Sequence, residues 1–396
     1  MKRFVYRQIA GRGGDYVTLL FWLFLFVAAG LGAAWYVDDQ GHQVTGMTNQ
    51  VVWTLPHVVS VFLILAAAGS FNVVTISRLF GRRAYWPLAR LSGLLAVALL
   101  AGGLFVLVLD LGRPDRLWVA MSHFNFKSTL ASNIFRYAGF VAAIGVFLWT
   151  VMEPRMSRYS RAACLVGFLF GISLSTGIGL EFGFLAAREA FDSALLAPMF
   201  VSLSLVLGLA VFILVLTACH VWSRRPLGKT VVRRLGNLLG VLVGVVLYFT
   251  VVHHLTTPYA AEHRGIERFI LLEGGVYTAL FWAGQVALGG LAPLFLIYYP
   301  RTAGSLGAVV VSALLVVIGG LAQIYVLIIG GQAYPMVLFP GMVEASVIDG
   351  HINAYAPSLP EAALGAGGVA LALAIVAVAV KVLPLLPESL ADEPAE

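Results

Sequence analysis

Long runs of hydrophobic residues alternate along the chain with short polar segments. Each run approaches or exceeds the roughly 20 residues that an α-helix needs to cross the hydrocarbon core of a bilayer. The runs lie near residues 17–37, 51–77, 88–109, 132–152, 162–180, 195–221, 235–256, 275–299, 306–330 and 361–384. The pattern predicts an all-α integral membrane protein with about ten transmembrane helices and no soluble domain.

The composition supports this interpretation. Hydrophobic residues make up 60% of the 396 positions and charged residues only 11%, whereas a soluble domain carries roughly 25% charged residues. The chain is therefore expected to lie in a lipid bilayer as one multi-pass membrane domain, residues 1–396. Its net charge of +6 is small, and we do not expect it to bind nucleic acid.

The positions of the basic residues test the number of spans independently. With ten spans, most of the 25 lysine and arginine residues fall on the same side as both chain ends. The other side holds Arg113, Arg116, Lys127, Arg136, Arg188, Arg264 and Arg268. Because loops rich in lysine and arginine remain in the cytoplasm, both termini are predicted to be cytoplasmic, in a bacterial inner membrane. The run 17–37 is long enough to be a retained first span rather than a signal peptide.

The two cysteines, Cys164 and Cys219, each lie within an apolar run. The sequence contains no CxxC or CxxCH motif, so we expect it to hold neither an iron–sulfur cluster nor a covalently attached haem. No other haem or metal site is expected in this chain. If the protein takes part in electron transfer, other subunits must carry the metal centres.

Two segments outside the predicted spans are distinctive. Residues 331–360 are rich in aromatic residues and prolines, include Tyr334 and Tyr355, and contain no basic residue. A long loop of this kind is typical of an ordered lid or a docking surface on the outer face. The C-terminal residues 385–396 are predicted to form a flexible cytoplasmic tail.

Charged residues gather where the third predicted helix ends. The segment Leu109-Asp-Leu-Gly-Arg-Pro-Asp-Arg-Leu-Trp118 is followed by His123-Phe-Asn-Phe-Lys-Ser128. Gly112 and Pro114 are expected to stop the helix and form a turn, because proline sets φ and disfavours α geometry in the preceding residue. Ionisable residues at this depth are costly and commonly functional. The alternative is a loop whose internal ion pairs simply cap two helices.

Several segments resemble the NrfD/PsrC family of polytopic membrane subunits. Asp110-Leu-Gly-Arg-Pro-Asp-Arg116 with Asn125-Phe-Lys-Ser128 is similar to the DLGRPxR…NPKS signature of that family. Three further similarities follow in the order found in the family: Thr176-Gly177 with Ser193 to Ser202, Phe281-Trp282 with Leu288-Gly289 and Pro293, and Tyr355-x-Pro-Ser-x-x-Glu361. Within the family, the chain most resembles the ten-helix DsrP branch, which belongs to the DsrMKJOP electron-transport complex of sulfur metabolism.

The resemblance implies a subunit that binds quinone, either menaquinone or ubiquinone, near the outer face. It implies electron exchange with a periplasmic ferredoxin-like iron–sulfur subunit, and a multihaem cytochrome c and a second membrane subunit as further partners. It also implies two four-helix bundles plus flanking helices, with the first bundle (helices two to five) in residues 38–194 and the second (helices six to nine) in 195–330. Such a protein is not catalytic alone but serves a quinone-linked oxidoreductase complex.

Quinone chemistry moves two electrons and two protons, and it suits His, Asp and Glu side chains near the water interface. His57 begins the second helix and Asp110 ends the third on the same side, so the two side chains are expected to meet. We expect His57 to hydrogen-bond a quinone oxygen, while Asp110 and Glu181 transfer protons. Arg113 and Ser175 complete the predicted quinone-binding set, and Ser175 stands where shorter family members often carry a tyrosine linked to quinone.

Other polar residues of the outer side are better suited to a protein partner, because charges there set encounter rate and register. The predicted docking residues are Asp115, Arg116, His123, Lys127, Tyr334 and Tyr355.

Two other functions remain open from the sequence. In the first, the protein is a b-haem membrane anchor in which His57 and either His253 or His254 are axial ligands. In the second, it is a secondary transporter, which requires discontinuous helices at corresponding places in two halves. Pro293 is expected to break the eighth helix, but the third and fourth helices have no equivalent proline.

Overall fold

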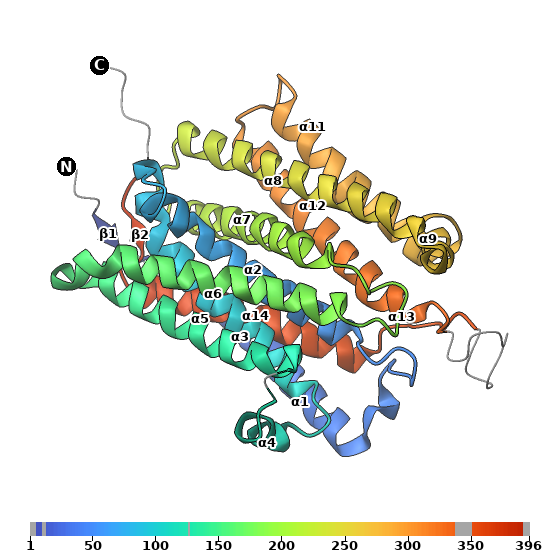
Figure 1. Cartoon of the computed structure of the whole chain (residues 1–396). Coiled ribbons are helices and arrows are strands. Elements are labelled where there is room, and N and C mark those ends of the chain that lie inside the picture. The colour runs from blue at the N-terminus through green and yellow to red at the C-terminus, as the bar shows by residue number, and fades with distance from the viewer. Residues whose placement is uncertain (1–4, 10–12, 126, 337–350, 391–396) are drawn as a thin grey trace.

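The computed structural model describes residues 5–9, 13–125, 127–336 and 351–390. Within these residues, ten helices are long and apolar enough to cross a membrane. This confirms the predicted all-α class and the number of spans. Figure 1 shows the helices packed side by side, with the connecting segments at the two ends.

The helices that form the spans agree closely with the apolar runs. Eight are α1 (Gly14–Gln40), α2 (Leu55–Arg78), α3 (Ala89–Leu109), α5 (Thr129–Met152), α6 (Ser160–Gly183), α7 (Leu196–Trp222), α8 (Lys229–Thr256) and α14 (Leu359–Val382). The remaining two spans are composite. One joins α10 (Val276–Ala279), the π-helix η8 (Leu280–Leu291) and α11 (Ala292–Tyr298), and the other joins α12 (Leu306–Tyr325), the π-helix η9 (Val326–Gly330) and α13 (Gly331–Ala333).

Shorter elements lie between the spans. They are the helices α4 (Leu117–Ser122) and α9 (Arg264–Arg268), the π-helix η7 (Phe269–Glu273), and the 3-10 turns η1 (His42–Val44), η2 (Arg83–Leu88), η3 (Pro114–Arg116), η4 (Pro154–Tyr159), η5 (Thr257–Tyr259) and η6 (Ala261–His263).

Pro293 does not break the eighth span, contrary to the sequence prediction. The span runs without interruption from Val276 to Tyr298. Pro293 lies in the first turn of α11, directly after the π-helix η8. Proline lacks the N–H that an α-helix interior requires, and a π-helical segment is one of the irregularities that a helix uses to accommodate such a defect.

Local sequence signals account for several helix starts. Ser128, Ser305 and Ser358 each accept a hydrogen bond from a backbone N–H in the first turn of α5, α12 and α14. At α14 the Glu361 carboxylate also accepts a hydrogen bond from the Ser358 N–H at 2.7 Å, which completes a capping box. Such caps satisfy backbone donors that would otherwise be unpaired at a helix start.

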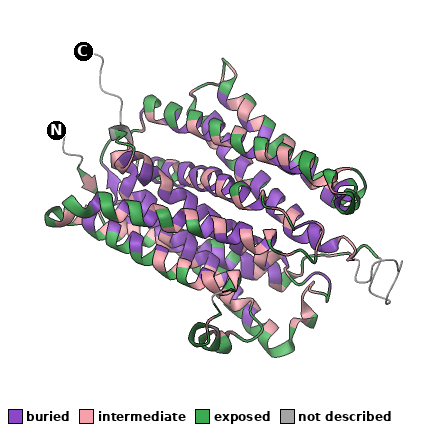
Figure 2. Ribbon diagram, in the orientation of Figure 1, coloured by how far each residue is buried: buried purple, intermediate pink, exposed green. Residues whose placement is uncertain are grey.

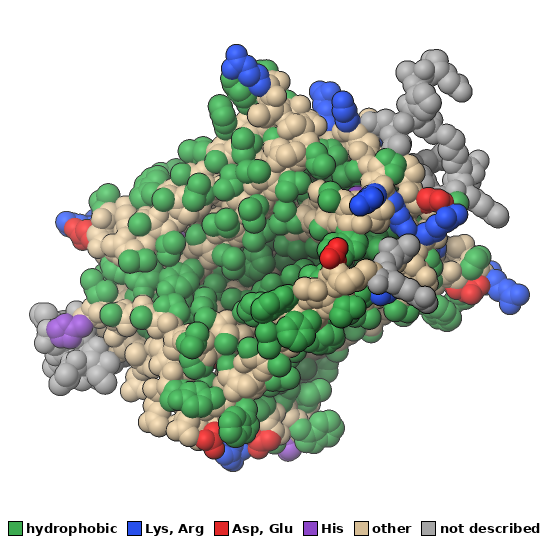
Figure 3. Space-filling view, turned by 180° about the vertical axis from the view of Figure 1, so that it is seen from behind, with side chains coloured by type: hydrophobic (Ala, Val, Ile, Leu, Met, Phe, Trp, Pro, Cys, Tyr) green, Lys and Arg blue, Asp and Glu red, His purple; other side chains and the backbone are tan. Residues whose placement is uncertain are grey.

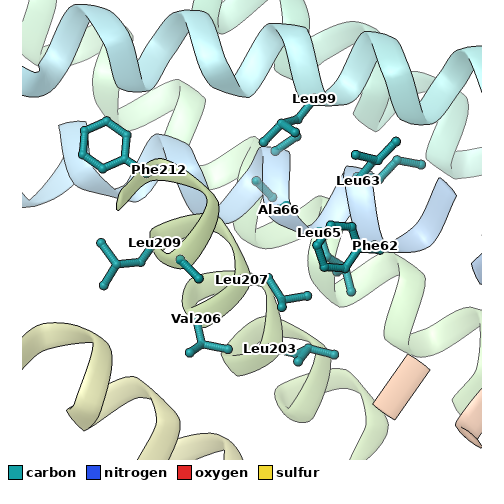
Figure 4. Packing of buried hydrophobic residues seen from close by; sticks show 14 of the residues in the cluster. Phe62, Leu63, Leu65, Ala66, Leu99, Leu203, Val206, Leu207, Leu209 and Phe212 are labelled. Atoms are coloured by element: carbon teal, nitrogen blue, oxygen red, sulfur yellow. The ribbon is translucent and has the colours of Figure 1, made fainter. Parts of the chain in front are cut away.

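Helix α2 lies at the centre of the molecule and is the most buried span (Figure 2). It packs against α3, α6 and α7, while α5 packs on α6. On the other side of α7, α12 contacts α7, α8 and the eighth span. Apolar side chains fill the contact between α2 and α7, among them Phe62, Leu65, Leu203 and Leu207 (Figure 4).

Both termini are brought to one end of the helices, which we call the terminal face. There β1 (Tyr6–Arg7) pairs antiparallel with β2 (Leu386–Pro387). The other end, which carries α4, α9 and the start of α14, is called the opposite face. Between the two faces the surface is mainly hydrophobic (Figure 3), as expected for a protein surrounded by lipid.

The described part of the predicted flexible tail is packed rather than free. Leu385, Leu386 and Leu390 are buried, and Leu390 forms a bridge with Leu227. Apolar side chains and strand pairing with β1 hold residues 385–390 in place, so proximity to the C-terminus is a poor guide to these residues. Residues 391–396 lie outside the described residues, as do residues 337–350 of the predicted outer loop.

Candidate functional site

The imidazole of His57 lies in the first turn of α2 at the opposite face. Its ring stacks on the indole of Trp53, with centroids 5.4 Å apart and ring planes 14° from parallel. Trp53 in turn contacts Phe182 at 5.3 Å and Phe191 at 6.0 Å between ring centroids. The imidazole is half-buried, and no described residue forms a hydrogen bond with it. Its nitrogens are therefore available to a ligand that enters beside this aromatic cluster.

Gln332 fixes the backbone on which Trp53 and His57 are mounted. This fully buried side chain accepts hydrogen bonds from the N–H groups of Val52 and Trp53, both at 3.0 Å, and donates to the Trp53 carbonyl at 2.9 Å. These bonds tie Val52 and Trp53 to the ninth span, outside α2, which begins at Leu55 rather than at the predicted residue 51. The end of the ninth span thus positions the start of the second.

Arg188 ties the same region together from the loop after α6. Its guanidinium donates to the carbonyl of Gln332 at 3.0 Å and to the carbonyl of Gln50 at 2.6 Å. The first turn of α2, the end of the ninth span and the 184–195 loop are consequently held as one unit around the aromatic cluster.

Glu181 lies one residue before Phe182, at the end of α6. Its carboxylate accepts a hydrogen bond from the side-chain amide of Asn133 on α5. The Asn133 carbonyl oxygen accepts from Arg136, which also donates to Ser132 at 2.7 Å. The second oxygen of the Glu181 carboxylate has no hydrogen-bond partner among the described residues. A carboxylate held on one side and open on the other can exchange a proton with a bound ligand.

Asp110 is the residue immediately after α3, and its surroundings differ from those of His57. Burial, together with the nearby Glu361 carboxylate, raises the pKa of Asp110 to about 6. Among the described contacts, no hydrogen bond joins Asp110 to His57. Near its end, α3 packs against α14, where Val106 and Leu364 belong to one apolar cluster. The predicted approach of Asp110 to His57 stays a prediction.

Glu361 belongs to a hydrogen-bonded network at the start of α14. Its carboxylate accepts from the Tyr355 hydroxyl at 3.0 Å and from the Gly46 N–H at 3.1 Å. The Tyr355 hydroxyl in turn accepts from the Leu55 N–H at 2.9 Å, in the first turn of α2. Tyr355, predicted to contact a partner, is therefore half-buried and links α14 to the helix that carries His57.

The turn after α3 is exposed and contains its own ion pair. Arg113 lies 3.7 Å from Asp115, and the two side chains are 64% and 69% exposed. Arg116, His123 and Lys127 are also exposed. A surface pair of this kind adds little stability. The sequence predicts that Arg113 binds quinone, but its exposure and its pairing with Asp115 suit a docking surface better.

Two other predicted residues are used within the fold. The hydroxyl of Ser175 is buried and donates to the Gly171 carbonyl of its own helix at 3.1 Å, so it is not free to reach a ligand. The ring of Tyr334 contacts the ring of Phe269 at 5.6 Å between centroids.

The site also contains three residues that are not predicted from the sequence: Asn133, Arg136 and Gln332. Asn133 and Arg136 are three residues apart inside an apolar run, a spacing that places two side chains on one helix face. Polar residues within a membrane span are usually functional, so the sequence did contain a signal for Asn133 and Arg136. Gln332 carried no local signal, since its partners lie 279 and 280 residues away.

The histidines considered as haem ligands have other partners in the structure. Nδ1 of His254 lies 2.9 Å from the Glu267 carboxylate, and the ring of His253 contacts the ring of His254. Among the described residues, no ring contact joins either one to His57, and no group of three or more metal-ligating side chains occurs.

Comparison with known proteins adds a family relationship. Residues 43–336 match the family described as polysulphide reductase, NrfD. The sequence is 26% identical to the Hdr-like menaquinol oxidoreductase integral membrane subunit of Archaeoglobus fulgidus, over 99% of each protein. It is 22% identical to the integral membrane subunit of menaquinone reductase from Nitratidesulfovibrio vulgaris, over 92% of this protein and 91% of that one. It is 21% identical to protein NrfD of Escherichia coli, over 72% and 96% respectively.

Proposed function

The chain belongs to the polysulphide reductase NrfD family, and from this premise we propose that it is the quinone-interacting membrane subunit of a multi-subunit redox complex. Two relatives that match along nearly their whole length carry menaquinol oxidoreductase and menaquinone reductase in their names. The observation that carries the proposal is the half-buried imidazole of His57, which stacks on Trp53 and has no hydrogen-bond partner among the described residues.

The surroundings of His57 suit the head group of a quinone. The rings of Trp53, Phe182 and Phe191 offer an apolar wall on which a flat ring can pack. The imidazole can hydrogen-bond one quinone oxygen, because a histidine nitrogen acts as donor or acceptor according to its protonation. Glu181, which immediately precedes Phe182 in the sequence, supplies a carboxylate for proton exchange with the same ligand.

The overall reaction defines what these residues must do. Reduction of one quinone takes up two electrons and two protons and releases one quinol, and oxidation of quinol is the reverse. In the proposal, electrons pass to or from an iron–sulfur subunit docked at the opposite face. Protons pass through the Glu181 carboxylate or through Asp110, whose pKa of about 6 suits proton exchange near neutral pH.

The finer assignments follow from the family resemblance. We place the opposite face in the periplasm of a bacterial inner membrane, with the exposed charges Asp115, Arg116, His123 and Lys127 facing a ferredoxin-like iron–sulfur partner. A DsrP-type complex would add a multihaem cytochrome c and a second membrane subunit. The arrangement of α2, α3, α5 and α6 as one bundle, and of α7, α8, the eighth span and α12 as another, belongs to the same proposal.

A pair of histidine variants tests the site. His57→Ala is expected to lower quinol-dependent electron transfer by the complex about tenfold or more, because an essential hydrogen bond to the substrate is lost. His42→Ala removes another half-buried histidine of the same face that is not part of the proposed site, and it should leave the rate of electron transfer nearly unchanged. Turnover is measured in membranes with a soluble menaquinol analogue, after normalising to the amount of assembled complex.

A third variant distinguishes the loss of a quinone contact from a defect in folding or assembly. His57→Gln keeps a hydrogen-bonding side chain and should retain more activity than His57→Ala, whereas a purely structural defect would lower assembly in both variants. Wild-type turnover in His57→Ala would contradict the proposed site.

A further inference from the structure

An apolar groove of about 220 Å³ opens at the terminal face between α1, α7 and α14. Its walls include Leu19 and Leu23 of α1, Ala218 of α7, and Leu373 and Val376 of α14. From Leu373 to Lys381 it extends about 12 Å along α14, at 1.5 Å per residue. None of these residues belongs to the site around His57, which lies at the other end of the molecule.

The position of the groove determines what can fill it. All three helices are long and apolar enough to cross the membrane, so the groove faces the hydrocarbon of the bilayer, where water does not compete for space. An apolar groove of this size, open to the bilayer and running along α14, suits an extended hydrocarbon chain.

A cation and an aromatic hydroxyl lie where the groove reaches the terminal face. The Lys381 ammonium lies 3.7 Å from the centre of the Tyr16 ring, and the Tyr16 hydroxyl donates to the Ala377 carbonyl at 3.2 Å. Within the described residues, Lys381 forms no ion pair with an acidic side chain. A lysine at this depth extends toward the head-group region, and its unmatched charge complements a phosphate.

Two other basic groups described at this face are already engaged. Arg225 donates to the carbonyls of Arg7, Gln8, Leu386 and Pro387, and Arg7 pairs with Glu388 at 3.3 Å. Among the described residues that line the groove, Lys381 is the cation available to a ligand.

We propose that this groove binds one acyl chain of an anionic phospholipid, whose phosphate pairs with Lys381. Tyr16 lines the same site at the depth where tyrosine is favoured in membranes. The lipid would fill the space between α1 and α7, beside the direct packing of α1 on α14.

Native mass spectrometry of the full-length protein in a neutral detergent tests the proposal with phosphatidylglycerol and phosphatidylcholine as probes. The wild type is expected to retain one phosphatidylglycerol with about fivefold preference over phosphatidylcholine, the contribution of a single lysine facing an anionic head group. Lys381→Gln should lose this preference, and Lys381→Arg should keep it. Ala218→Trp, which fills the groove from an exposed position, should reduce the binding of both lipids.

A matched control uses the same terminal face. Arg301 also lies over a tyrosine ring, that of Tyr299 at 6.0 Å, but it does not line the groove. Arg301→Gln should leave the lipid preference unchanged. Equal retention of both lipids by the wild type, or an unchanged preference in Lys381→Gln, would overturn the proposal, as would a bound quinone in place of the phospholipid. If Ala218→Trp does not fold, the contrast between Lys381→Gln and Lys381→Arg still tests whether the positive charge at this position selects the anionic lipid.

Discussion

The carboxyl group of Asp110 is held partly away from water at the end of α3. Burial and the Glu361 carboxylate raise its pKa from the ordinary value of 3.8 to about 6. The charged form is therefore disfavoured in the folded protein. Asp110 destabilises the fold above pH 6, and this cost disappears as the pH falls through about 6 toward 4.

Asp110→Asn should accordingly stabilise the protein in a pH-dependent way. We expect its midpoint of thermal unfolding to exceed that of the wild type by about 2 °C or more at pH 8, and the difference to fall to about a third of that value near pH 4.5. Scanning fluorimetry across this pH range measures the effect. Asp115→Asn, at an exposed position in the same turn, is the control and should show no such trend. A constant difference at all pH values would mean that the pKa of Asp110 is not raised.

The individual residues of the candidate site could be predicted only in part. His57, Asp110 and Glu181 were identifiable because ionisable side chains at the ends of apolar helices are costly and therefore informative. Their partners were not, because the hydrogen bonds that the Val52 and Leu55 N–H groups donate to Gln332 and Tyr355 join segments about 300 residues apart. Only the packed fold brings such pairs together, and so the sequence alone could not indicate them.

At the scale of the elements, the contact between α2 and α7 depends on two glycines. A Cβ atom at Gly69 would overlap the backbone carbonyl of Ser204, and one at Gly208 would overlap the backbone of Gly69 itself. The two helices can approach this closely only without side chains at these positions, as is common for helices packed within membranes. The contact joins the two halves of the molecule.

Gly69→Ala and Gly208→Ala are each expected to destabilise the protein by about 3 kcal/mol, because backbone atoms rather than flexible side chains must move. The measurement is the midpoint of thermal unfolding together with the yield of monodisperse protein. Gly145→Ala on α5 is the matched control: its new methyl group would meet no atom within 4 Å, so stability should change by less than about 1 kcal/mol. Equal stability of Gly69→Ala and Gly145→Ala would show that α2 and α7 are not in close contact.

The spans themselves were predictable because a membrane imposes one simple requirement on every crossing helix, a long apolar sequence with all backbone groups paired internally. The irregular segments within the spans were less predictable. The π-helix η8 contains Gly289, which closely approaches Gly319, and it ends just before Pro293. Hydrophobicity reveals neither this segment nor the second π-helix, η9. Residues 385–390 were misjudged for a related reason, since their order comes from pairing with a strand near the N-terminus.

At the scale of the whole molecule, charge is distributed unequally between the two faces. The terminal face carries the loops with Arg155, Arg158, Arg224, Arg225 and Arg301, whereas the opposite face carries most of the acidic residues. Because successive spans run in opposite directions, the loops that carry these arginines all lie at one end of the molecule. The rule that basic loops remain in the cytoplasm then predicts that the opposite face, with His57 and the exposed charges after α3, is periplasmic.

Single cysteines placed at the two faces would test this orientation. Ser122→Cys lies at the opposite face and Ser157→Cys at the terminal face, and both positions are exposed. The native cysteines Cys164 and Cys219 are buried, so they should add little background. In intact spheroplasts, a membrane-impermeant maleimide is expected to label Ser122→Cys about tenfold more than Ser157→Cys, which should react fully only after permeabilisation. Reversed labelling would place the site around His57 on the cytoplasmic side, and a periplasmic iron–sulfur partner could then no longer be the subunit that exchanges electrons with quinone there.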